Sequence, residues 1–207
     1  LYSLMENFYI SNFNLDFYNR EIERYGGSSC IEHAEKVFAQ DSYACINIFE
    51  MKAKSKISIS DDTLGLLNIL SYLDAFKLSL EEKLIFLDRS VSTSLHRDSF
   101  KSKRKDFLET AINYINNTIN NEEQKTILRI YEKRKKSIEN YLQQIRKIHN
   151  NNNNIKYQIL DSLIHMSMNR MFGTNVEYEL KLRSYTRHTI YVLYCMDKKY
   201  TLKRNKK

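Results

Sequence analysis

The chain has 207 residues, of which 42% are hydrophobic and 28% charged, a composition too apolar for a disordered protein and a length suited to one domain. Around ten prolines would be expected at average usage, but there are none and only four glycines, which excludes collagen-like and turn-dense β-sandwich folds and favours long helices. Much of the net charge of +8 lies in the last ten residues and in Lys133–Lys136, without a recognisable nucleic-acid motif, which indicates solvated faces.

The first predicted element is a β-strand over residues 10–18. Apolar Phe13, Leu15 and Phe17 alternate with polar residues, a period typical of a half-buried strand. The segment ends at Gly26 and Gly27. Two short helices are expected next, over residues 30–39, capped by serines at 28 and 29, and over residues 41–49, capped by the Asp-Ser pair at 41 and 42.

Longer helices are predicted through the middle of the chain. Ser60 opens a helix with inward leucines at 64, 67, 70 and 73, and Ser79 with Glu82 forms a capping-box pattern before the next helix. Apolar residues at three- and four-residue steps predict helices over residues 99–119 and 122–148, folded back as a helical hairpin near Asn120.

A run of five asparagines, residues 150–154, predicts a loop before two last helices. These cover residues 157–172, ended by Gly173, and residues 176–196. The expected fold is α+β, a predominantly helical domain over residues 1–197 with a small β-sheet, followed by a basic tail over residues 198–207.

The cysteines indicate neither a disulfide framework nor a metal site. Cys30, Cys45 and Cys195 are an odd number without a CxxC pair, so we expect small core residues. No apolar run approaches the ~20 residues of a membrane span, and the first residues lack the features of a signal peptide. A cytoplasmic protein is expected, and its lysine-rich segments leave open a peripheral association with the anionic inner face of the membrane.

Two segments contain residues suited to chemistry. In the first, residues 18–27, a strand gives way to a charged turn with Glu21 and Arg24, which from spacing alone is read as an exposed ion pair. In the second, residues 162–173, helical periodicity places Ser162, His165 and Asn169 on one face. Histidine titrates near neutral pH and can transfer a proton, although a single helical histidine is more often a structural hydrogen-bonding group.

These two segments carry a family resemblance. REIERYGG, residues 20–27, and SLIHMSMNRMFG, residues 162–173, resemble the two signatures of the C-terminal domain of lantibiotic dehydratases, a domain shared with thiopeptide-type bacteriocin biosynthesis proteins. In that family a large N-terminal part uses glutamyl-tRNA to esterify Ser and Thr of a precursor peptide. The C-terminal domain then eliminates glutamate to leave dehydroalanine or dehydrobutyrine. The resemblance implies that this chain is a lyase for the second step.

The resemblance also implies roles for particular residues. Glu21, Arg24 and His165 match catalytic positions, while substrate-binding positions are matched by Arg20, Tyr25, Ser162, Asn169 and Arg170. Such a site needs a positioned base for the Cα proton and cationic partners for the departing carboxylate. Neither metal nor organic cofactor is expected. The expected partners are a glutamylated precursor peptide and the N-terminal glutamylation domain, with a lantibiotic cyclase, a transporter and a second copy of the chain as further candidates.

Several alternatives stay open. Related thiopeptide domains catalyse a cycloaddition of two dehydroalanines, and a truncated, non-catalytic peptide-binding scaffold is a second alternative. A basic RNA-binding helical protein is a third. The family domain normally has about a hundred further residues upstream, including another arginine of the site, so the isolated chain is expected to have an incomplete sheet and to be a poor catalyst.

Overall fold

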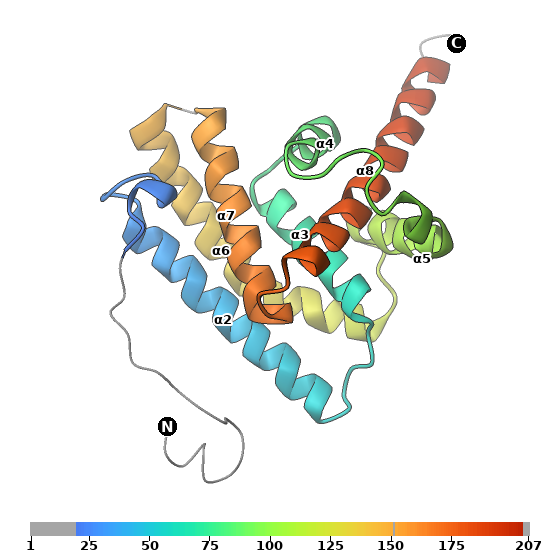
Figure 1. The fold of residues 1–207 in the computed structure, drawn as a ribbon, viewed down its shortest axis with the longest axis horizontal. Coiled ribbons are helices and arrows are strands. Elements are labelled where there is room, and N and C mark those ends of the chain that lie inside the picture. Colours follow the sequence, from blue (N-terminus) through green and yellow to red (C-terminus); the bar gives the residue numbers. More distant parts are fainter. Residues whose placement is uncertain (1–19, 151, 205–207) are drawn as a thin grey trace.

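The computed structural model describes residues 20–150 and 152–204, and these residues are predominantly helical (Figure 1). A short 3₁₀ turn and seven α-helices follow one another there: η1 (Glu23–Tyr25), α2 (Ile31–Ala53), α3 (Asp61–Ala75), α4 (Leu80–Asp88), α5 (Arg97–Ile115), α6 (Glu122–His149), α7 (Asn153–Phe172) and α8 (Val176–Arg204). The predicted strand over residues 10–18 lies outside the described residues. Because the described residues contain no strand, only the helical part of the α+β expectation is supported.

The helices form two groups that share α3. In the first group α2 packs along α6 and also contacts α7, and the η1 turn sits on α7. In the second group α8 packs against α3, α4 and α5, and Figure 1 shows α4 and α5 on different sides of α8. No helix of the described part of the chain is both long and apolar enough to cross a membrane.

Helix α3 is the centre of the core because it is apolar on every side. The four leucines expected to face inward are buried, and so are Leu66 and Ile69 on the other faces. A helix that is hydrophobic all round must be covered all round. Its contact with α8 is close at Gly65, where an added Cβ would lie 2.6 Å from Cδ1 of Leu182.

Two predictions of helix arrangement are wrong. Residues 31–53 form one continuous helix, α2, not two short ones, and Asp41 is buried inside it instead of capping a new helix. Its first turn also lacks a side-chain cap, since the N-cap residue is Cys30 and not one of the serines. Helices α5 and α6 do not pack as a hairpin, because α6 packs on α2 and α3 while α5 packs on α8.

The predicted helix signals at Ser60, Ser79 and Gly173 are confirmed. Ser60 and Ser79 cap α3 and α4, and Ser79 forms a complete capping box with Glu82. Gly173 ends α7 with a positive φ of 76°. The asparagine run is only partly a loop, because Asn152 caps α7 and the helix begins at Asn153.

Candidate functional site

The first motif, residues 20–27, forms a tight turn that is held by hydrogen bonds from α6. Gly26 and Gly27 have φ of 85° and 92°, a region that side chains with a Cβ rarely adopt. The hydroxyl of Tyr141 donates to the carbonyl of Tyr25 over 2.7 Å, and Nε2 of His149 lies 2.8 Å from the carbonyl oxygen of Gly26. The two glycines therefore let the chain bend onto α6 and α7, and this fixes the preceding charged residues.

Arg24 crosses from this turn to α7. Its Nε donates to Oγ of Ser162 over 2.9 Å, while its Nη1 lies 3.0 Å from Oε2 of Glu21. The Arg24 side chain is 35% exposed and that of Glu21 is 56% exposed, so the ion pair by itself adds only about 0–1 kcal/mol. The bond to Ser162 joins the two motifs, which are 138 positions apart in the sequence.

His165 lies one helical turn beyond Ser162 on α7 and is held by a carboxylate of α8. Its Nδ1 is 2.7 Å from Oε2 of Glu179, and its Nε2 is 3.2 Å from Nδ2 of Asn169. A carboxylate only accepts hydrogen bonds, so Nδ1 donates to Glu179, and in the neutral form of the ring the Nε2 lone pair accepts from the Asn169 amide. The histidine side chain is 36% exposed, which leaves part of the ring accessible.

A buried arginine holds Glu179 in turn. Nε of Arg183 lies 2.7 Å from Oε1 of Glu179, and the side chains are 4% and 9% exposed. The same guanidinium donates to Oδ1 of Asp161 over 2.7 Å and to the Asp161 carbonyl over 3.3 Å. We call His165, Asn169, Glu179, Arg183 and Asp161 the α7–α8 polar cluster. Together its members fix the orientation of the imidazole.

Sequence reasoning missed Glu179 and Arg183. Their i,i+4 spacing is a recognisable helical ion pair, which sequence alone reads as a surface feature. Only the packing of α8 on α7 shows that the pair is buried and that the glutamate faces His165. A carboxylate behind a histidine is the arrangement that orients a general base in many enzymes.

Three of the expected substrate-binding residues lie elsewhere. Tyr25 is 3% exposed, with its ring edge-on to Phe38 at 4.9 Å, so it is a core residue of the turn. Arg170 points inward, and its Nη1 donates to Oδ2 of Asp41 over 3.1 Å. Arg20 is exposed and pairs with Glu35 at 2.9 Å. The structure thus brings together Glu21, Arg24, Ser162, His165 and Asn169 along α7.

This arrangement offers a guanidinium and an oriented imidazole on one partly exposed stretch of α7. The guanidinium matches a carboxylate in shape and charge, and an imidazole can accept or donate a proton. No group of three or more His, Cys, Asp or Glu within the described residues is arranged to hold a metal ion. The chemistry that Arg24 and His165 support is proton transfer on a substrate whose anionic group is bound by the guanidinium.

Residues 1–190 match the family model described as the C-terminal part of lantibiotic biosynthesis dehydratase, and the chain belongs to this family.

Two curated relatives have similar sequences. The chain is 32% identical over 193 residues to the subtilin biosynthesis protein SpaB of Bacillus subtilis, covering 92% of the chain and 19% of that protein. It is 26% identical over 199 residues to the nisin biosynthesis protein NisB of Lactococcus lactis subsp. lactis, covering 90% of the chain and 18% of that protein. The chain therefore spans about a fifth of the length of these relatives.

A solved structure has the same fold. The tRNA-dependent lantibiotic dehydratase MibB of Microbispora sp. 107891 superimposes with a TM-score of 0.79 at 17% sequence identity. The match covers 95% of the chain and 21% of that protein.

Proposed function

We propose that this chain eliminates glutamate from glutamylated Ser and Thr residues of a lantibiotic precursor peptide, giving dehydroalanine and dehydrobutyrine. The observation that carries the proposal is the convergence of two distant motifs on α7, where Arg24 bonds to Ser162 one turn from His165. Membership of the dehydratase C-terminal family supports the same reaction class.

In the proposed step, the substrate displaces the Asn169 amide from Nε2 of His165, and this nitrogen then accepts the Cα proton of the modified residue. The Cα–H electron pair forms the Cα=Cβ bond, the Cβ–O ester bond breaks, and glutamate leaves with a free carboxylate. Glu179 supports this step because its carboxylate holds Nδ1 protonated and stabilises the positive charge that the imidazole gains. This assigns His165 as the base, a choice that the sequence alone left open.

Arg24 is the proposed partner of the departing carboxylate. Its Nε is fixed by Ser162 and its Nη1 by Glu21, so the guanidinium is positioned before the substrate binds. A positioned cation stabilises charge that develops in the transition state more than charge already present in the ground state. The carboxylate of Glu21, which is exposed, is available for the ammonium group of the glutamyl adduct.

The proposed partners follow from the reaction. The substrate is a glutamylated precursor peptide, supplied by a glutamylation domain that uses glutamyl-tRNA. A cyclase and a transporter are proposed to act after the dehydration step. These partners are carried over from the family and rest on its chemistry.

The test supplies a synthetic glutamylated precursor peptide and follows release of glutamate by mass spectrometry. Two proteins are assayed: the chain itself, and a chimera in which the chain replaces the matching segment of SpaB. We expect His165→Ala to slow elimination about 100- to 10,000-fold, the usual contribution of a general base. Arg24→Gln is expected to cost about 100- to 1000-fold, the usual contribution of one charge-stabilising donor.

Glu179→Gln separates positioning from binding. The amide keeps the size of the side chain but loses the charge that supports the imidazolium, so kcat falls while KM stays the same. The control is Lys136→Gln, an exposed residue of α6 outside the polar cluster, which should leave the rate unchanged. Wild-type rates in the histidine or arginine variant would disprove the assignment. Binding of the peptide by both proteins without release of glutamate would favour the non-catalytic scaffold.

A further inference from the structure

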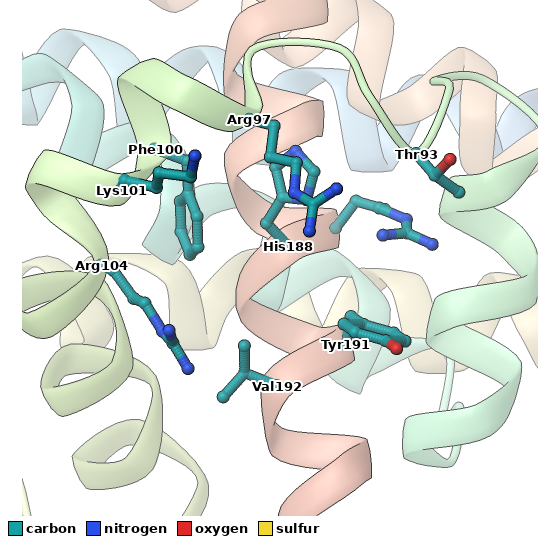
Figure 2. A pocket seen from close by; sticks show the side chains of 9 residues that line it. Thr93, Arg97, Phe100, Lys101, Arg104, His188, Tyr191 and Val192 are labelled. Atoms are coloured by element: carbon teal, nitrogen blue, oxygen red, sulfur yellow. The ribbon is translucent and has the colours of Figure 1, made fainter.

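A pocket of 430 Å³ opens between α5 and α8, and it shares no residue with the α7–α8 polar cluster. Figure 2 shows Arg97 and Arg104 extending from the α5 side toward the space that Tyr191 and Val192 border on α8. The complete lining is formed by Thr93, Arg97, Phe100, Lys101, Arg104, Arg187, His188, Tyr191 and Val192. Its volume falls in the range of roughly 300–1,000 Å³ that is typical of small-molecule sites.

The lining has an excess of positive charge. Four of its side chains are cationic, and none of the described residues that line it is acidic. Arg187 is neutralised by Asp88 at 2.8 Å, and Lys101 by Asp98 at 2.7 Å. Arg97 and Arg104 are exposed and have no ion-pair partner among the described residues. Two guanidinium groups are therefore left for an anion from outside.

The remainder of the pocket is aromatic. The rings of Phe100 and His188 lie 5.2 Å apart and are almost fully buried, so they form a rigid floor. Burial lowers the pKa of His188, and Nε2 of its neutral ring donates to the carbonyl of Leu95 over 2.9 Å. Tyr191 is 46% exposed and packs against the guanidinium of Arg187 at 5.1 Å. Its outer face is thus open within the same pocket as the two unpaired arginines.

We propose that this pocket binds a nucleotide, with its phosphate between Arg97 and Arg104 and its base against Tyr191. A phosphate monoester carries close to two negative charges, which equals the excess of two cations, and guanidinium forks bind phosphate oxygens in pairs. A single carboxylate would leave one of the two arginines without a counter-charge. An exposed tyrosine next to a phosphate site is a surface on which a base can stack. This inference does not depend on the proposed elimination reaction.

The experiment titrates the 207-residue chain by calorimetry, in buffer without phosphate, with AMP, adenosine, inorganic phosphate and a short single-stranded oligoribonucleotide. AMP is expected to bind more tightly than either inorganic phosphate or adenosine, because each of these contains only half of the recognised group. An oligoribonucleotide that binds much more tightly than AMP, with a strong salt dependence, identifies a nucleic-acid strand as the source of the nucleotide. Equal affinity for AMP and the oligoribonucleotide identifies a free nucleotide.

Two pairs of variants test the contacts. Arg97→Gln with Arg104→Gln is expected to weaken AMP binding at least about tenfold, as expected for lost charge-assisted hydrogen bonds. Lys105→Gln with Lys136→Gln removes the same charge from exposed positions outside the pocket and should have little effect. Tyr191→Ala should weaken AMP binding but leave phosphate binding unchanged. Tyr191→Phe should leave the binding of both unchanged. Equal loss in both double variants, AMP binding no tighter than phosphate, or no binding of AMP would overturn the proposal.

Discussion

Asp41→Asn should destabilise the fold strongly, because Asp41 is the centre of a buried polar network. Its Oδ1 accepts from Nη1 of Arg134 over 2.5 Å, from the Ser167 hydroxyl over 2.8 Å and from the Tyr72 hydroxyl over 3.0 Å. Burial raises the pKa of Tyr72, so its hydroxyl stays protonated and remains a donor. Oδ2 of Asp41 accepts from Arg170, and the side chains of Asp41 and Arg134 are each only 1% exposed.

The magnitude follows from the charge left behind. Asparagine has the same size, but it leaves the Arg134 guanidinium buried without a counter-ion, a change that typically costs about 3–5 kcal/mol. Arg170 adds less to this cost because its side chain is 23% exposed and can be hydrated. Domains are typically stable by about 5–15 kcal/mol, so the variant should lose a large part of the free energy of unfolding.

The assay is urea unfolding followed by far-ultraviolet circular dichroism, in which a lower midpoint at unchanged slope reports a loss of stability. Asp98→Asn is the control, since that carboxylate is 92% exposed and its solvated pair with Lys101 should contribute little to stability. In the double variant Asp41→Asn with Arg134→Met, removing both charges should recover much of the loss. A change below about 1 kcal/mol in the single variant would refute the account of the network.

Three further predictions concern packing, thiol reactivity and capping. Gly65→Ala should cost about 1–3 kcal/mol of unfolding free energy, because the new methyl overlaps Leu182, and the same substitution in a Leu182→Ala background should cost nothing or stabilise α3; an equal cost in both backgrounds would contradict this. Burial and the nearby Asp41 raise the pKa of Cys45 to about 12, so at about pH 8 it is an unreactive thiol. Iodoacetamide should therefore modify the half-buried Cys195 well before Cys45, as peptide mass mapping would show, and the reverse order would exclude this reading. Ser79→Ala should cost about 0.5–2 kcal/mol in thermal unfolding by removing the capping box of α4, and an unchanged midpoint would show that the cap is not needed.

Several features that depend only on neighbouring residues could be predicted from the sequence. Ser60 and Ser79 predict helix starts because a side-chain oxygen accepts a hydrogen bond from a backbone N–H group only two or three residues away. Gly173 predicts a helix end because glycine tolerates a positive φ. The two motifs likewise identified Arg24 and His165 as candidate residues without any knowledge of their distance in space.

Features that depend on partners far along the chain could not be predicted, because they arise only when the helices pack. Asp41 looked like the cap of a short helix, because nothing nearby reveals that Arg134, 93 positions away, buries and neutralises it. Glu179 and Arg183 have the i,i+4 spacing of a surface ion pair, and only the packing of α8 places the Glu179 carboxylate against His165. A local pattern sets the face of a helix on which a side chain lies. Which charge meets that face depends on how the helices pack, and packing is set by the whole core.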